Sequence, residues 1–473
     1  MAPLFVPAAL SIFCVAIIVP SYQVVVAHDV SNLAKVACLS AAIPIEAWAA
    51  LTDLYTAYHI SKGDRHIDFH QLHEKYGKIV RFGPRRISIR SAEALKDIYS
   101  TSANVKRSDV YASSAHFFGG TPSSNTTPDM KEHAFRRRVN VRALSASNIK
   151  SMEEKILRNI RYFCDQLVDE GKDGWSSPRD MSKYVGHLVS DMMGDITFSK
   201  NWEVQQKPDN RDLLVSLPEA VAGIHLRPET GDGFSTEQLV SEAGLLIAAG
   251  SDTTITATTA TFFYLTHYPD SLRRVQDDIR SRFADLEDIC IGPELASCRY
   301  LAACIEESLR MSPPVGSTIM REVLPGGLEV DGEWFPPKTD LGVPHYALHH
   351  DERYFPDAFT FKPERWLTEE LGPAKSDGKT ETSLRTNAAF SAFGVGRTSC
   401  IGRYLAYQEI SLVVARTLWL YDVRIEPGST IGEGQKSMGS GRQRKNQFQT
   451  LDRFVSTHQG PSLQFRRKLS GYY

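Results

Sequence analysis

Hydrophobic residues are concentrated first at the N-terminus of the chain. Residues 1–27 carry no charged side chain, and most of them are apolar. A helix of about 20 apolar residues crosses the hydrocarbon core of a membrane. A secretory signal peptide would have a basic start and a shorter apolar run. The pattern favours a membrane anchor over 1–27, against a cleaved signal or a buried core helix. It leaves 28–64 as a linker with a first helix and 65–473 as the main domain.

The rest of the chain carries mainly the helical period of apolar side chains. The longest such segment runs over about 235–267, where Ser235 and Gln238 make a capping box and Pro269 follows the end. A helix of that length spans about 50 Å and is typical of the centre of a large domain. The pattern predicts other helices over 45–61, 65–77, Ala92–Tyr99, 130–167, 180–198 and 400–420, with more up to Met311.

Short β-rich runs lie between and after these helices. IVRFGPRRISIRS is broken by Gly83-Pro84, and LEVDGEWF is broken by Asp331-Gly332, a dipeptide favoured in two-residue hairpin turns. The pattern also predicts a strand over 341–348, an irregular stretch over 350–398 and a β-rich C-terminal tail. The predicted fold class is therefore mainly α with small antiparallel β-sheets (α+β).

Composition and cysteine spacing narrow the classes of function. The net charge is -2 over 473 residues, so the chain lacks the basic balance of a nucleic-acid-binding protein. Seven cysteines lie at scattered positions without Cys-x-x-Cys spacing. This spacing argues against a disulfide framework, and it predicts that most of the chain faces a reducing compartment.

The run AFSAFGVGRTSCIGRYLAYQE carries the strongest chemical signal. Cys400 lies in a glycine-containing loop that leads directly into a helix. The N–H groups and the positive dipole end of a helix start stabilise a thiolate, and glycines let backbone approach a flat ligand closely. A lone cysteine is more often a buried structural residue, but this setting favours a thiolate ligand for haem iron, shielded by Phe393. No second ligand lies at the spacing of a zinc finger.

A second polar signal interrupts the centre of the longest predicted helix. Asp252 and Thr253 lie in the otherwise apolar run LLIAAGSDTTITATT. A buried carboxyl group is costly unless it is hydrogen-bonded or takes part in chemistry. A threonine that bonds to its own helix can bend the helix and open a groove. Taken alone, this pattern is equally compatible with a polar stripe on a core helix.

Together these motifs resemble the cytochrome P-450 superfamily over roughly residues 70–465. FGVGRTSCIG is similar to its haem-binding loop, Phe-x-x-Gly-x-Arg-x-Cys-x-Gly. The resemblance implies a haem b cofactor with Cys400 as the axial iron ligand. The arginine of the motif, which contacts a haem propionate in the family, is replaced here by Thr398. The other residues that the resemblance places around the cofactor are Phe393, Gly394, Gly396, Gly402 and Arg397, which is the expected substitute for the missing arginine.

The long helix and a distant pair of motifs extend the resemblance. AGSDTT over 249–254 is similar to the oxygen-activation motif of the family, which implies that Asp252 and Thr253 are the catalytic proton relay. Glu307 and Arg310 lie at i, i+3 on one helix, and FKPERW supplies Arg365. These three residues resemble the buried triad that supports the haem loop in the family.

HAFRRR is similar to the Trp-x-x-x-Arg helix of the family. His133 stands in place of the tryptophan, and the resemblance implies that Arg137 pairs with a haem propionate. Without the cysteine loop, a solvated basic helix face would be the preferred interpretation. Arg136, Arg138 and Arg403 are expected to join Arg137 in a basic face that steers an acidic redox partner.

Longer stretches, among them RMSPPVGSTIMREVLPGG and the tail GRQRKNQFQTLDRFVSTHQGP, resemble fungal secondary-metabolism members of the benzoate-hydroxylase and trichothecene-hydroxylase type. The resemblance implies a monooxygenase that inserts one oxygen atom of O2 into an apolar small molecule, such as a terpenoid, a polyketide or an aromatic metabolite. Electrons would come from NADPH through a cytochrome reductase. It also implies single-pass anchoring in the endoplasmic reticulum membrane, with the catalytic domain facing the cytosol.

The same comparison marks the substrate region and one departure. Substrate contacts are expected from 111–128, with His116, Phe117 and Phe118, from 313–320 and from the tail near 445–460. The stretch between Phe198 and Ser235 is roughly 50 residues shorter than the lid region of the family. It predicts either an open pocket or a gene model that lacks an exon. Two other functions stay open, an inactive haem-binding protein and a haem-thiolate isomerase or dehydratase that needs no reductase.

Overall fold

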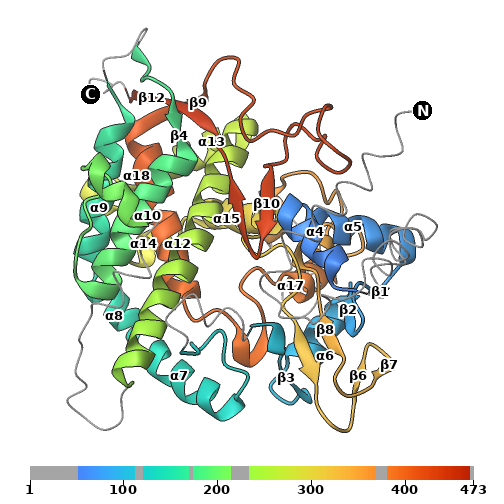
Figure 1. The fold of residues 1–473 in the computed structure, drawn as a ribbon. Coiled ribbons are helices and arrows are strands. Elements are labelled where there is room, and N and C mark those ends of the chain that lie inside the picture. Colours follow the sequence, from blue (N-terminus) through green and yellow to red (C-terminus); the bar gives the residue numbers. More distant parts are fainter. Residues whose placement is uncertain (1–51, 112–120, 170–173, 215–233, 368–380, 469–473) are drawn as a thin grey trace, which may run out of the picture. The chain divides into compact units, whose positions relative to one another are not determined.

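A computed structural model describes residues 52–111, 121–169, 174–214, 234–367 and 381–468 (Figure 1). The predicted anchor over 1–27 and the aromatic residues at 116–118 lie outside these residues, as does most of the linker. Among the helices of the described ranges, none is both long and apolar enough to cross a membrane.

The chain divides into two compact units. The smaller unit contains, of the described residues, 52–58 and 81–86, and there the Thr56 hydroxyl donates a hydrogen bond to the carbonyl of Phe82 over 3.4 Å. The larger unit contains 59–80 and everything after 86. All of the candidate functional residues that the structure describes belong to the larger unit.

Helix α12 (Thr236–His267) is the longest element of the described chain. The predicted capping box is confirmed, because the Ser235 side chain accepts from the Gln238 amide while the Gln238 side chain accepts from the Ser235 amide. The helix packs against α10 (Met181–Phe198), α15 (Arg299–Met311) and α18 (Arg403–Leu420). Figure 1 shows α12 running between α10 and α15.

The helical character predicted over 130–167 is confirmed, but a reading of that range as one helix would be wrong. The structure has three helices there, α7 (Met130–Ala143), α8 (Ala146–Ser151) and α9 (Glu153–Leu167). Ser145 interrupts the first helix and caps the second, because its side chain accepts from the amide of Asn148. A serine that bonds to nearby backbone competes with helix propagation.

The strand expected over 341–348 is also wrong beyond its first residues. Strand β8 (Asp340–Gly342) is short, and α16 (His345–His349) follows it. Pro344 has no amide to donate to a sheet, and it occupies the position just before the helix.

Another helix, α17 (Glu381–Ala389), lies in the stretch 350–398 that was expected to be irregular. Within the described ranges, the remaining helices are α4 (Leu54–Lys62), α5 (Arg65–Tyr76), α6 (Ala92–Tyr99), α13 (Pro269–Arg282), α14 (Pro293–Ala296) and the 3-10 helices Pro208–Leu214, Leu286–Asp288, Pro363–Trp366 and Gly396–Thr398.

The strands form small sheets whose recorded pairings are antiparallel. In the largest sheet the order is β1-β2-β8-β5-β3, with β1 (Ile79–Arg81), β2 (Arg86–Ile89), β5 (Arg321–Val323) and β3 (Val105–Arg107). Asp331 and Gly332 connect β6 (Leu328–Val330) to β7 (Glu333–Phe335) with positive φ of 50° and 80°, so the predicted hairpin turn is confirmed. The other strands are β10 (Thr450–Arg453) paired with β11 (Val455–His458), and β12 (Ser462–Arg467) between β4 (Arg179–Asp180) and β9 (Tyr421–Ile425).

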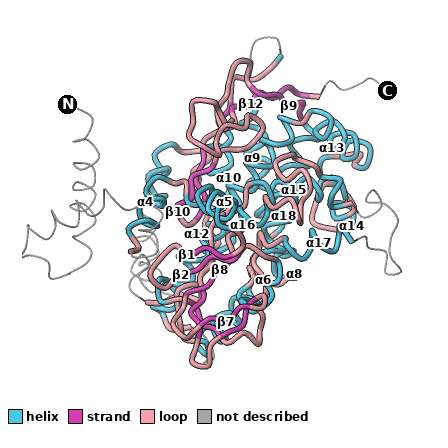
Figure 2. Tube along the Cα trace, turned by 90° about the vertical axis from the view of Figure 1, so that its right-hand side faces the viewer, coloured by secondary structure: helices cyan, strands magenta, loops and turns pink. Residues whose placement is uncertain are grey.

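The main hydrophobic core surrounds α12 and α18. Phe262 and Phe263 of α12 pack there with Leu412 and Val413 of α18, and all four side chains are almost fully buried. A second cluster lies between α6 and the largest sheet. Figure 2 shows α13, α14, α15 and α18 grouped together, apart from the strands β1, β2 and β8. The predicted α+β class with small antiparallel sheets is confirmed.

Candidate functional site

The cysteine loop joins the 3-10 helix Gly396–Thr398 to α18. The amide of Cys400 donates to the carbonyl of Phe393 over 2.8 Å, which folds the loop back on itself. Gly396 has φ of 68°, and a Cβ atom there would lie 1.8 Å from the carbonyl oxygen of Tyr99. Only glycine fits this contact. At Gly402 the nearest atom to an added Cβ is the Cys400 sulfur at 3.8 Å, so no steric contact requires glycine at that position.

Cys400 presents its thiol at the start of α18. Of the cysteines that the structure describes, it is the one with an exposed side chain. Nearby protein nevertheless desolvates the thiol and raises its pKa, and the amides of Gly402 and Arg403 and the guanidinium of Arg137 act in the opposite direction. A metal that binds the sulfur would lower this pKa and hold the thiolate form. The Cys400 sulfur is therefore accessible to a ligand, and nearby amides and the Arg137 guanidinium favour its negatively charged form.

Phe393 and the first turns of α18 cover one side of the loop. The ring of Phe393 lies 5.0 Å from that of Tyr407, centroid to centroid, and the guanidinium of Arg403 lies 5.5 Å from the Phe393 ring. The Tyr407 hydroxyl donates to the Glu306 carboxylate. Phe393 thus contacts both an aromatic ring and a cation of α18.

Helix α7 reaches the cysteine loop through Arg137. Its Nη1 donates to the carbonyl of Ser399 over 2.7 Å, and its Nη2 donates to the Ser399 hydroxyl over 3.3 Å. Its neighbour Arg136 is 1% exposed and pairs with Glu132 and Glu242 instead. The expectation that Arg136 belongs to an exposed basic face is therefore wrong. Arg138 and Arg403 are exposed.

A cavity of about 490 Å³ lies beside this contact. Six arginines line it, together with Asp129. Four of the arginines donate to neutral oxygens and form no ion pair with a carboxylate of the described residues. These four, called the arginine cluster below, are Arg107, Arg137, Arg321 and Arg397, and the other two, Arg138 and Arg142, are exposed.

His133 also lines the cavity, and its pKa reflects the positive charge of the arginines around it. Burial and the four members of the arginine cluster together lower its pKa to about 4. The imidazole is therefore neutral at physiological pH. Several cations without carboxylate partners around one cavity form a site for an anion, above all for carboxylates that arginine can bind in pairs of hydrogen bonds.

The Arg397 side chain does not contact Thr398, the residue that replaces the arginine of the family motif, but binds backbone carbonyls near β3. Its guanidinium donates to the carbonyl of Val105 over 3.2 Å. Arg321 of β5 contacts Thr398 instead and donates to its hydroxyl over 2.6 Å. Sequence reasoning missed Arg321 and Arg107. The sequence shows Arg321 only as an arginine that opens the short β-rich run REV. Nothing in that run indicates that the side chain is buried or which residue it contacts.

The polar centre of α12 has the expected backbone bond. The Thr253 hydroxyl donates to the carbonyl of Ala249 over 2.6 Å. Asp252 is exposed at its surface, but enough protein surrounds the carboxyl group to raise its pKa above the usual range. Thr254 faces Glu409 of α18 over 3.4 Å, and burial raises the pKa of Glu409 to about 8. This contact links α12 to the helix that follows Cys400.

The structure brings the three predicted triad residues together. Arg310 donates to Glu307 through two bonds of 2.9 Å, and Arg365 donates to Glu307 over 3.0 Å. All three side chains are buried. Burial alone would raise the pKa of Glu307, but Arg310 and Arg365 outweigh it and hold that pKa below the usual range. Such a network stabilises a fold only when it is complete.

The sequence of this chain is similar to known proteins over most of its length. The family model described as Cytochrome P450 matches residues 51–225 and 209–450. The cytochrome P450 monooxygenase AKT7 of Alternaria alternata is 34% identical over 482 residues, which cover 89% of this chain and 91% of that protein. The cytochrome P450 monooxygenases poxM of Penicillium oxalicum and apf7 of Gibberella fujikuroi are 31% and 32% identical, over 88% and 89% of this chain and 88% and 92% of the relatives.

Proposed function

The chain belongs to the cytochrome P450 family and is a monooxygenase, and we propose that it uses haem b to oxygenate an apolar small molecule of fungal secondary metabolism. The family implies a haem iron, a redox partner, O2 and a small-molecule substrate. The proposal adds the type of haem, the class of substrate and the electron donor, an NADPH-dependent cytochrome reductase.

The observation that carries the proposal is the pairing of an exposed thiol with an arginine cluster that has no carboxylate partner. A haem b group needs one protein ligand for its iron and brings two propionates. Cys400 fits the first requirement, because α18 directs amide donors to its sulfur. The arginine cluster and the neutral His133 fit the second. Phe393 and the glycine loop supply the close, apolar approach that a flat macrocycle needs.

When bound, a haem with a thiolate ligand supplies oxygen activation, because thiolate donation favours cleavage of the O–O bond. The residues of the chain would hold and orient the group. Arg137 and Arg321 would bind propionate oxygens, and Arg397 would act from its place against the backbone of β3. Glu307, Arg310 and Arg365 would support the loop from the side of α15.

Thr253 and Asp252 are proposed to deliver protons during the reaction. The Thr253 hydrogen is engaged with the carbonyl of Ala249, so the lone pairs of the hydroxyl oxygen remain available to accept a hydrogen bond. Asp252 is exposed and has a raised pKa, which suits a group that takes a proton from solvent and releases it inward. These two features match the requirements of a proton relay.

Electron delivery is proposed to occur on the side of Arg138 and Arg403. Both cations are exposed near the cysteine loop, and such charges speed the approach of an acidic flavoprotein reductase. The apolar run over 1–27 is proposed to anchor the chain in the endoplasmic reticulum membrane, with a single span and the catalytic domain facing the cytosol.

The first test is the difference spectrum of the dithionite-reduced full chain with carbon monoxide. We expect the long-wavelength Soret band that a thiolate trans to carbon monoxide gives. The Cys400→Ser variant should lose that band, and the matched variant Cys290→Ser should keep it. Haem without the band would favour an inactive haem-binding protein. With the band present, product formation that does not consume NADPH would favour an isomerase or dehydratase over a monooxygenase.

A further inference from the structure

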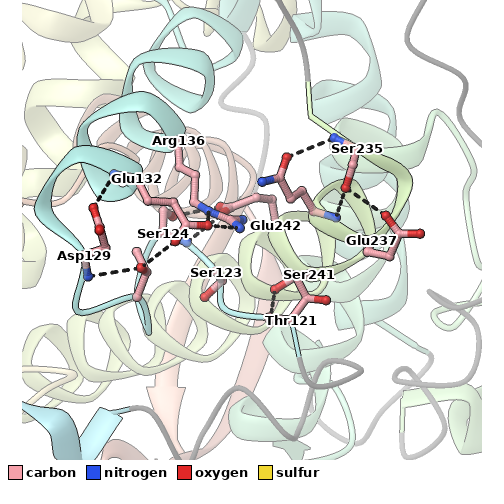
Figure 3. A network of polar contacts seen from close by, with 12 residues as sticks. Thr121, Ser123, Ser124, Asp129, Glu132, Arg136, Ser235, Glu237, Ser241 and Glu242 are labelled. Atoms are coloured by element: carbon pink, nitrogen blue, oxygen red, sulfur yellow. Dashed lines mark hydrogen bonds and ion pairs between the residues drawn. The ribbon is translucent and has the colours of Figure 1, made fainter.

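A buried polar network joins α7, α12 and the segment 121–128 (Figure 3). Its centre is Glu242, near the N-terminal end of α12, which is 2% exposed. The Glu242 carboxylate accepts from Arg136 over 3.0 Å, from Asn140 over 2.7 Å and from the Ser124 hydroxyl over 2.8 Å, and it also accepts from the Ser124 amide. All of these partners are donors, so the position requires an acceptor with a negative charge.

The network holds one face of α7. Glu132, Arg136 and Asn140 lie at i, i+4 and i+8 and therefore share one side of the helix. Arg136 binds a carboxylate on each helix, since it donates to Glu132 of α7 over 2.6 Å and to Glu242 of α12 over 3.0 Å. The rotation of α7 about its own axis is thus set by the acid on α12.

The adjacent face of α7 carries the residues that reach the cysteine loop. His133 and Arg137 are each one position further along than Glu132 and Arg136, which turns them about 100° around the helix. Arg137 donates to Ser399, the residue before Cys400. A helix that is held on one face cannot rotate to release the other, so the two contacts are mechanically connected.

We propose that Glu242 is a positioning residue that acts through Arg136 and α7 to hold Arg137 on the cysteine loop and so to keep Cys400 in place as the iron ligand. This inference rests on the proposed haem function. Glu242 touches neither the loop nor the cavity beside it. Its role is to tie α12, which carries Asp252 and Thr253, to the loop that carries Cys400.

A neighbouring hydrogen bond offers a control, because it joins α12 to the same segment without involving α7. Ser241, the neighbour of Glu242 on α12, donates to the carbonyl of Thr121 over 2.8 Å. This bond connects α12 to the same segment 121–128, but it does not involve α7 (Figure 3). Ser241→Ala should therefore leave Arg137 and the cysteine loop unaffected.

The test is a double-mutant cycle of Glu242→Gln with Arg137→Gln. The readout is the rate at which the ferrous–carbon monoxide spectrum of the full chain changes from the thiolate form to the thiolate-free form at fixed temperature and pH. We expect Glu242→Gln to increase this rate about tenfold, because its amide N–H would meet donors only and Arg136 would lose one of its two carboxylate partners. If Glu242 acts through Arg137, the same change made in Arg137→Gln should have almost no further effect.

A second variant separates positioning from general stability. Arg136→Met with Glu242→Leu removes both charges of the buried ion pair and so leaves no buried charge unpaired, although Asn140 and Ser124 lose an acceptor. We expect a moderate fall in the unfolding temperature and, when each protein is measured at the same interval below its own unfolding temperature, a faster loss of the thiolate form than in the wild type. Equal rates in this variant and the wild type, or rate effects that multiply in the cycle, would overturn the inference. Absence of the thiolate band from the wild type would instead reject the proposed function.

Discussion

Arg321 donates a hydrogen bond to the hydroxyl of Thr398 over 2.6 Å, so an arginine of strand β5 stands beside the position where the haem-loop motif of the family has its own arginine. Arg321 is 4% exposed, and its guanidinium also lies 5.2 Å from the ring of Tyr99. The departure at Thr398 is thus accompanied by a cation from a distant part of the chain. Several consequences can be measured.

Arg321 should contribute more to haem retention than Arg397. Arg321→Leu removes a cation of the arginine cluster, and a hydrogen bond to a charged group is worth about 1.5–3 kcal/mol. We expect the haem to transfer to apomyoglobin more than about tenfold faster from this variant, and less change for Arg397→Leu, whose guanidinium donates to backbone carbonyls. The matched control is Arg273→Leu, because Arg273 is an exposed arginine that does not line the cavity. A larger effect at Arg397 than at Arg321 would contradict the assignment.

Gly396 and Gly402 should differ strongly in their tolerance of alanine. Gly396→Ala places a methyl group 1.8 Å from the Tyr99 carbonyl at a left-handed φ, whereas Gly402→Ala has 3.8 Å of clearance. The left-handed conformation alone costs an alanine about 1–2 kcal/mol. We expect Gly396→Ala to lose the thiolate-ligated spectrum and to lower the thermal unfolding temperature, and Gly402→Ala to retain both. Similar behaviour of the two variants would show that the loop does not hold this conformation.

Thr253→Ala should reduce the share of NADPH consumption that ends in oxygenated product. Proton delivery by a positioned side chain contributes about 10² to 10⁴ in rate, so we expect productive turnover to fall by at least about 10². The control is Thr266→Ala, because Thr266 lies on the same helix and makes the same type of bond to the carbonyl four residues earlier. The ratio of product to NADPH consumed is the measurement. An unchanged ratio in Thr253→Ala would remove Thr253 from the relay.

The folded enzyme should lose stability as the pH falls from about 6.5 towards 4. Burial lowers the pKa of His66, His73 and His345 to about 4. Their unfolded pKa is about 6.5, so above that value both states are neutral and these groups add no pH dependence. Below it the unfolded state binds protons first, and each group costs up to about 3 kcal/mol by the time the folded pKa is reached.

Denaturant unfolding at pH values between 7 and 4.5 tests this expectation. His345→Asn removes one of the three groups and keeps a donor near the Ser391 hydroxyl, which the His345 ring contacts at 2.7 Å. The variant should therefore show a shallower decline of unfolding free energy with falling pH. A decline as steep as that of the wild type would assign the acid sensitivity to other groups.

The sequence by itself determined the features that depend on neighbours a few residues apart. The capping box at Ser235 and Gln238, the turn at Asp331 and Gly332, and the placement of Cys400 before a helix all follow from local backbone chemistry. The family motifs around Asp252, Glu307 and Cys400 could be read for the same reason, since each is a short run of fixed spacing. The helix that replaces the expected strand after Pro344 shows the limit of such reading, because short apolar segments fit either structure.

Only the tertiary structure decided which distant charges meet. Arg321 and Thr398 are 77 positions apart, and Arg136 and Glu242 are 106 apart. In the run Arg136-Arg137-Arg138, one arginine is buried against α12, the next contacts the cysteine loop and the third is exposed. The sequence shows three equal cations there. The rotation of α7 between its two partners assigns each a different environment, because successive side chains on a helix point about 100° apart.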